Sequence, residues 1–167
     1  MVTTMNATSF DAWVTARQAS LLRFGYLVTG SAEGAQDAVQ TAVTEAFARW
    51  EHVGRLEDPE TYVRRMIANA HISNWRRFGR RQVVVAEPRG GAGGDASERI
   101  AEHDAVWRMC ATLPPQQRAA VVLRFYEDLD YPEIAGVLGC SETTARSHIH
   151  RALRRLHTTL TAQGTNR

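Results

Sequence analysis

The sequence predicts an all-α fold of two small helical domains joined by a flexible linker, with a helix-turn-helix in the second domain. Apolar residues recur at helical spacing along most of the chain, and strand-like alternation is almost absent. The segment 83–97, VVVAEPRGGAGGDAS, has four glycines and a proline and no periodic apolar face, which is typical of a linker. We expect domains at 1–82 and 98–167, with helices at 9–28, 32–50, 59–80, 96–112, 115–126, 131–138 and 142–160.

Composition limits the class of protein. The chain has 167 residues, of which 44% are hydrophobic, enough for buried cores, and its net charge of +2 does not by itself indicate a nucleic-acid partner. Cys110 and Cys140 are far apart and form no CxxC pair, so neither a disulfide framework nor a cysteine zinc site is expected. No secretory signal is evident, and no run approaches the roughly 18 apolar residues of a membrane span. We therefore expect a cytoplasmic protein that does not insert into membranes.

The stretch GCSETTARSHIHRALRRL, residues 139–156, has an unusual polar side. Its apolar residues recur at helical spacing and should face a core: Ala145, Ile149, Ala152, Leu153 and Leu156. The opposite face carries hydroxyls, an imidazole and guanidiniums in place of the usual glutamates and lysines: Thr143, Arg146, Ser147, His150, Arg151 and Arg154. Such side chains can bond base edges or phosphates.

The residues upstream place this helix in a helix-turn-helix. Asp130 with Glu133 three residues later predicts a capped short helix, Gly139 predicts the turn, and Ser141 can cap the following helix. In a helix-turn-helix the second helix enters the major groove, where an arginine can grip guanine O6 and N7 through its fork. An ordinary solvated helix face in a bundle is the alternative. We favour DNA binding because the turn, both caps and the charge asymmetry coincide.

A second basic run, YVRRMIANAHISNWRRFGRR, occupies residues 62–81. It contains arginines 64, 65, 76, 77, 80 and 81 and no acidic residue, whereas residues 1–60 are rich in acids. Six like charges on one helix repel one another unless an anion balances them. Trp75 and Phe78 lie among these arginines and suit stacking on exposed bases. Alternatively, Trp75 is part of the core, because it can share a broad face with Val63, Ile67 and Ala70.

The histidines and carboxylates do not assemble into an enzyme. His148 and His150 are two apart on a helix and point to different faces, and the sequence contains neither HExxH nor G-x-S-x-G. GGAGG at 90–94 lacks the preceding strand and following lysine of a phosphate-binding loop. We expect no catalytic activity, no metal and no cofactor.

Three segments together resemble the extracytoplasmic-function (ECF) group of bacterial sigma factors, the promoter-specificity subunits of RNA polymerase. GAQDAVQTAVTEAFARW at 34–50 is similar to the family's region-two helix, with Asp37 and Gln40 matching its D-x-x-Q. PETYVRRMIANAHISNWRRFGRR at 59–81 resembles the segment that opens and reads the −10 element, with Asn69 matching the family's asparagine. LPPQQRAAVVLRFYEDLDYPEIAGVLGCSETTARSHIHRAL at 113–153 is similar to region four.

The resemblance implies a role for each segment. It implies that Asp37 and Gln40 dock on the polymerase clamp and that region four reads the −35 element and touches the flap. The implied −10 residues are Arg64, Arg65, Asn69, Trp75, Arg76, Arg77 and Arg80, and the implied −35 residues are Thr143, Thr144, Arg146, Ser147, His150, Arg151 and Arg154. Core RNA polymerase and promoter DNA are the expected partners, and an anti-sigma factor is a further candidate partner.

Two other functions are alternatives to that of a sigma factor. A transcription regulator could bind an operator by itself through residues 113–156, but a sensor domain would not need an acidic helix followed by an aromatic-laced arginine helix. A purely structural helical adaptor would leave both basic faces without a purpose. We therefore predict a protein that directs core RNA polymerase to promoters.

Overall fold

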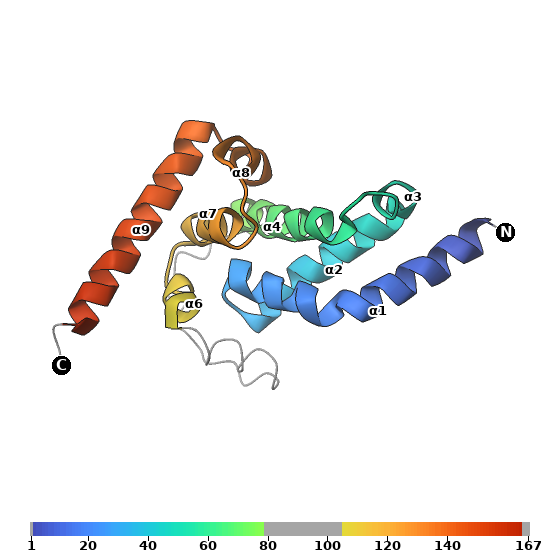
Figure 1. The fold of residues 1–167 in the computed structure, drawn as a ribbon, viewed down its shortest axis with the longest axis horizontal. Coiled ribbons are helices and arrows are strands. Elements are labelled where there is room, and N and C mark those ends of the chain that lie inside the picture. The colour runs from blue at the N-terminus through green and yellow to red at the C-terminus, as the bar shows by residue number, and fades with distance from the viewer. Residues whose placement is uncertain (1, 79–104, 165–167) are drawn as a thin grey trace.

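The computed structural model describes the backbone of residues 2–78 and 105–164 and the side chains of residues 9–77 and 108–164. Within these ranges every regular element is a helix (Figure 1). The helices are α1 (Val2–Thr29), α2 (Ala32–Ala48), α3 (Trp50–Val53), α4 (Pro59–Phe78), α6 (Ala105–Cys110), α7 (Pro115–Phe125), α8 (Tyr131–Leu138) and α9 (Glu142–Gly164). The prediction of an all-α fold is confirmed.

The helix bounds follow the predicted ones, with differences at the ends. α8 has the predicted bounds, whereas α1 begins earlier than residue 9 and α9 continues past residue 160. The predicted helix 32–50 is divided at Arg49, whose backbone leaves the helical region, and the short α3 turns Trp50 and Val53 into the core. The linker 83–97 and residues 96–104 of the predicted fourth helix lie outside the described residues, so the domain boundaries stay a prediction.

Helices α1 to α4 form the first half of the molecule, and small residues let them approach closely. α2 buries Ala38, Ala42 and Ala46 on one side, a spacing of four residues that makes one stripe. A side chain at Gly25 of α1 would begin 3.1 Å from Val39, so glycine fits the contact with α2. α1 and α4 fill the remaining core with larger side chains, among them Leu21, Phe24, Val28, Val63, Ile67 and Ile72.

Helices α6 to α9 form the second half. α7, α8 and α9 pack on one another around Leu123, Ile134, Leu138, Ala145 and Ile149. A separate small cluster, Met109, Cys110, Leu113, Val121, Ala152 and Leu156, joins α6 and α7 to the middle of α9. None of the helices that the structure describes is both long enough and apolar enough to cross a membrane.

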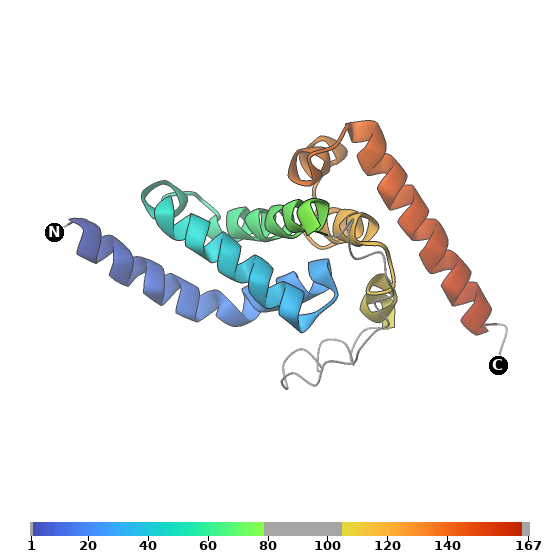
Figure 2. The same cartoon turned by 180° about the vertical axis from the view of Figure 1, so that it is seen from behind.

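The two halves pack against each other. α7 lies against α1 and α4, and α8 lies against α4 (Figures 1 and 2). One continuous apolar cluster contains Phe24 and Val28 of α1 together with Ala119, Ala120 and Leu123 of α7. The rings of Phe24 and Tyr126 lie 5.9 Å apart across the same boundary. The two helical halves thus share a buried interface.

Candidate nucleic-acid interface

The turn between α8 and α9 has the predicted caps. The Glu133 amide donates to the Asp130 carboxylate at 2.9 Å, and the Asp130 amide donates to the Glu133 carboxylate at 3.0 Å, which completes a capping box. Gly139 ends α8 with a φ of +62°, a left-handed conformation that favours glycine. The Thr144 amide donates to the Ser141 hydroxyl at 3.1 Å at the start of α9. These contacts fix the direction in which α9 leaves the turn.

One side of α9 is buried and holds the helix on the second half. Ala145, Ile149, Ala152 and Leu156 are buried as predicted. The prediction that Leu153 faces the core is wrong, because its side chain is 44% exposed. At 100° per residue Leu153 lies about 80° around the helix from Ala145, at the flank of the stripe rather than its centre.

The other side of α9 presents the predicted reading residues to solvent. Thr143, Thr144, Arg146, His150, Arg151 and Arg154 are exposed, and Ser147 is half-buried. The guanidinium of Arg146 pairs with Glu142 at 2.9 Å and lies over the Tyr131 ring at 4.3 Å. Cation–π stacking of this kind restricts the side chain and keeps its fork near the start of α9. The arrangement suits contact with a groove or backbone of DNA.

The predicted −10 residues of α4 lie on two sides of the helix. Asn69 and Arg77 line a polar groove of about 600 Å³ between α2 and α4, together with Asp37 and Gln40 of α2. The structure therefore brings together the predicted docking pair and part of the predicted −10 set. His71 borders the same groove, and burial lowers the pKa of its imidazole to about 4, with the nearby Arg118 charge adding to the effect.

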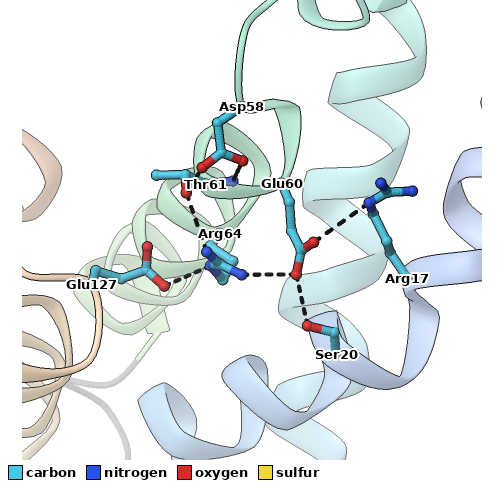
Figure 3. A network of polar contacts seen from close by, with 7 residues as sticks. All are labelled: Arg17, Ser20, Asp58, Glu60, Thr61, Arg64 and Glu127. Carbon is cyan, nitrogen blue, oxygen red and sulfur yellow. Dashed lines mark hydrogen bonds and ion pairs between the residues drawn. The ribbon is translucent and has the colours of Figure 1, made fainter.

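Three other predicted −10 residues, Arg64, Arg65 and Arg76, which we call the interface arginines, turn toward the second half. Arg64 forms an ion pair of 2.6 Å with Glu127, whose side chain is only 2% exposed (Figure 3). Arg65 approaches Glu133 at 3.4 Å. Arg76 donates to the backbone carbonyl of Leu138 and, at 3.2 Å, to that of Gly139. The basic run was expected to need a balancing anion, and Glu127 and Glu133 of the same chain supply part of that negative charge.

A polar network anchors Arg64 from the side of the first half. Glu60 pairs with Arg64 at 2.8 Å and with Arg17 of α1 at 3.4 Å, and it accepts a hydrogen bond from Ser20 (Figure 3). Asp58 accepts hydrogen bonds from Thr61, which lower the pKa of its carboxyl. Burial raises the pKa of Glu127, and the Arg64 charge partly opposes that rise. The network holds the Arg64 guanidinium at the boundary between the halves.

Trp75, Arg77 and Arg80 also belong to the predicted −10 set. Trp75 is half-buried, so it is neither a fully buried core residue nor a freely exposed one. Arg80 lies outside the described residues. Arg77 is exposed and lines the α2–α4 groove.

Arg118, which is 8% exposed, has a structural role that was not predicted from the sequence. Its guanidinium donates to the carbonyl of Thr29 at the end of α1 and, at 2.8 Å, to that of Leu113. It leaves no room for a side chain at Gly30, where a Cβ would lie 2.7 Å from Nη1. Burial lowers the pKa of Arg118. The signal that could have indicated it is LPPQQR at 113–118, an LP-x-x-QR pattern that opens the segment resembling region four.

Comparison with known proteins identifies the family. Residues 13–81 match the family description "Sigma-70 region 2", and residues 103–156 match "Sigma-70, region 4". RNA polymerase sigma-E factor of Streptomyces coelicolor is 33% identical over 154 residues, which cover 92% of this chain and 87% of that protein. ECF RNA polymerase sigma factor SigL of Mycobacterium tuberculosis is 29% identical over 158 residues, which cover 89% of this chain and 87% of that protein.

A solved structure has a similar fold. It is the sigma factor RpoE of Bartonella quintana, crystallised in complex with the anti-sigma factor NepR. The TM-score is 0.59 at 20% identity, and the match covers 92% of this chain and 97% of that one. This likeness concerns the fold alone.

The chain belongs to the ECF group of the sigma-70 family of RNA polymerase sigma factors. It contains region two in its first half and region four, with the helix-turn-helix, in its second. As a sigma factor it binds core RNA polymerase and promoter DNA and directs promoter recognition and transcription initiation. It is not an enzyme, because the chemistry of transcription belongs to the polymerase.

Proposed function

We propose that the two halves divide promoter recognition between them, with α9 reading the −35 element and α4 holding a separated −10 strand. The exposed face of α9 is the observation that supports this division. α9 is the second helix of a helix-turn-helix in which both helices are capped, and its exposed face contains arginines, hydroxyls and an imidazole. A recognition helix presents its N-terminal part to base edges in the major groove. The buried stripe on the opposite side leaves this face free for duplex DNA.

Residues along α9 have different tasks under this proposal. Arg146 and Arg151 read guanine through their forks, while Ser147 and His150 between them contact base edges. Thr143 and Thr144 lie in the first turn, where hydroxyls and backbone amides bind phosphate. Arg154, farther along the helix, contacts the DNA backbone and contributes salt dependence more than sequence preference.

In the first half, Asn69 and Arg77 contact the −10 strand from the α2–α4 groove. Trp75 stacks on an unpaired base, and Arg64, Arg65, Arg76 and Arg80 contact phosphates along the strand. Unstacking costs a few kcal/mol per base step, and aromatic stacking with charge contacts offsets that cost. The exposure of Asn69 and Arg77 supports this assignment.

Asp37 and Gln40 dock on the polymerase clamp. Both are exposed on α2, and they share the groove with Asn69 and Arg77. Docking there would hold the −10 strand next to the clamp. The second half meets the polymerase flap, and an anti-sigma protein, such as the one crystallised with the B. quintana sigma factor, is a candidate regulator.

Run-off transcription tests the proposal together with gel shifts. Core polymerase should produce promoter-specific transcripts only when this chain is added, whereas the free chain should bind promoter duplex weakly. Tight, sequence-specific duplex binding by the free chain would instead favour a regulator that binds an operator by itself.

A further inference from the structure

One aromatic ring, that of Tyr131, contacts arginines from two other helices of the second half. Tyr131 is the first residue of α8, directly after the Asp130 cap, and its half-buried side chain packs against the main apolar cluster. The guanidinium carbon of Arg124, in the last turn of α7, lies 5.2 Å from the centre of the ring. That of Arg146 in α9 lies closer, at 4.3 Å. The ring is therefore a point where α7, α8 and α9 meet.

The surroundings of Tyr131 hold its ring in place. The capping box fixes the first turn of α8, where the residue begins the helix. Arg124 is itself held, because it donates to the Leu129 carbonyl at 2.9 Å. A tyrosine side chain has fewer rotatable bonds than an arginine and loses less entropy when it is ordered. Tyr131 is thus a fixed platform for the longer and more flexible side chain of Arg146.

Arg146 is also held by charge. Its Nη2 donates to the carboxylate of Glu142, one turn earlier in α9, at 2.9 Å. The two side chains are 59% and 47% exposed, so this ion pair alone contributes little. The pair uses a single N–H donor of a guanidinium that has several, and the others can bond a base edge. The ring of Tyr131 is the contact that fixes the plane of the guanidinium.

We propose that Tyr131 is a positioning residue that sets the sequence preference of the −35 contact, by holding the Arg146 guanidinium where it meets a guanine edge. The proposal rests on the function proposed above for α9. An unrestrained arginine is drawn to the phosphates beside the groove, and phosphate contacts carry no sequence information. Bidentate contact with guanine O6 and N7 requires a guanidinium of defined plane and direction.

The effect of Tyr131 should be confined to one base position. Arg151, the other arginine proposed to read guanine, lies more than one helical turn farther along α9 than Arg146. Loss of the ring should therefore relax the preference at the position that Arg146 reads and leave the position that Arg151 reads unchanged. A general loss of folding would relax both preferences together, so the two effects can be told apart.

The test is run-off transcription by core polymerase from promoters randomised at the −35 element. Tyr131→Leu removes the ring but keeps apolar bulk, and it should reduce discrimination at the Arg146 position about three- to tenfold. Tyr131→Phe should keep the wild-type ranking, because a phenylalanine ring also attracts a cation. Phe125→Leu, which removes a 58% exposed ring at the end of α7, is the matched control and should change no ranking.

A double-variant cycle shows whether Tyr131 acts through Arg146. Arg146→Ala identifies the base position concerned. Adding Tyr131→Leu to Arg146→Ala should cause no further loss at that position, because the guanidinium that the ring holds is gone. Urea denaturation checks that each variant is folded. If Tyr131→Leu is unfolded, Tyr131→Met, which keeps a longer apolar side chain, takes its place.

Nuclear magnetic resonance tests the geometry in the free chain. The Nε–H proton of Arg146 should be shifted upfield by the ring current in the wild type and in Tyr131→Phe. The shift should disappear in Tyr131→Leu. This measurement on the wild type needs no destabilising variant.

Three results would overturn the proposal: no ring-current shift in the wild type, a wild-type ranking in Tyr131→Leu, or a further loss when Tyr131→Leu is added to Arg146→Ala. A failure of the proposed function looks different. If Arg146→Ala itself keeps the wild-type ranking, Arg146 does not read a base, and the positioning role of Tyr131 falls with that assignment. If Arg146→Ala changes the ranking and Tyr131→Leu does not, α9 still reads the −35 element and only the role of Tyr131 is wrong.

Discussion

Single side chains at the boundary between the halves make contacts that join the two halves. Arg118 is the clearest case, because one buried guanidinium satisfies carbonyls from both halves, among them those of Thr29 and Leu113. A buried arginine normally has a carboxylate partner, and here backbone carbonyls take that place. The residue joins the LP-x-x-QR segment to the end of α1.

Replacing Arg118 by methionine should lower the free energy of unfolding by about 2–3 kcal/mol, because buried carbonyls would lose their donor. Urea denaturation followed by circular dichroism measures the change. Arg155→Met, at an exposed position of α9, is the control and should stay within about 0.5 kcal/mol of the wild type. Equal stability of the two variants would show that the Arg118 contacts are dispensable.

His71 should make stability depend on pH. Burial holds its folded-state pKa at about 4, below its ordinary value of 6.5. As the pH falls from about 6.5 to about 4, the unfolded chain binds a proton that the folded chain does not, so up to about 3 kcal/mol of stability is lost. Urea unfolding across this range measures the loss.

The variant His71→Gln isolates that contribution. Glu127 acts in the opposite direction, because its raised pKa makes the folded chain take up a proton first as the pH falls. Subtracting the variant from the wild type removes Glu127 from the comparison and leaves His71. His71→Gln should reduce the loss of folding stability that accompanies the fall in pH, whereas His157→Gln, at an exposed position, should not. An unchanged pH dependence in His71→Gln would contradict the burial argument.

At the scale of helices, local sequence signals predicted most of the structure. The bounds of α8 followed from Asp130, Glu133 and Gly139, whose contacts lie within a few residues of one another and can therefore be deduced from spacing. The division of α2 from α3 at Arg49 could not be predicted, because no glycine or proline marks it. It depends on the packing of Trp50 against Phe10 and Trp13, which are far away in the sequence.

Removal of the predicted docking pair on α2, Asp37 and Gln40, should weaken the binding of the chain to core polymerase. Asp37→Ala with Gln40→Ala should weaken binding to core polymerase about tenfold, a cost of about 1.4 kcal/mol, and change folding stability by only about 0.5 kcal/mol, since both side chains are exposed. Fluorescence anisotropy with labelled chain measures the affinity. Gln36→Ala, exposed on the same helix but outside the groove, is the control. Native circular dichroism with unchanged affinity would rule out this docking site.

At the scale of the whole molecule, the contact between the halves could not be predicted from the sequence. The exposed face of α9 was predicted, because helical periodicity separates it from the buried stripe. The positions of Arg64, Arg65 and Arg76 against the second half were not predicted, because their partners Glu127, Glu133 and the Leu138 carbonyl lie more than 60 residues away along the chain. Periodicity shows which residues share a face, but not which distant segment covers it.

The division of promoter reading between the halves is tested most directly by transcription from a library randomised at both the −35 and the −10 elements. The wild type is compared with Arg151→Ala in α9 and Asn69→Ala in α4, and Arg49→Ala serves as a control at an exposed position outside both faces. Arg151→Ala should lose about 1–3 kcal/mol of discrimination at particular −35 positions and keep the wild-type ranking of −10 sequences. Asn69→Ala should lose discrimination at particular −10 positions and keep the wild-type ranking of −35 sequences. If either variant keeps the wild-type ranking at its own element, or changes the ranking at the other one, the division of labour proposed for α9 and α4 is wrong.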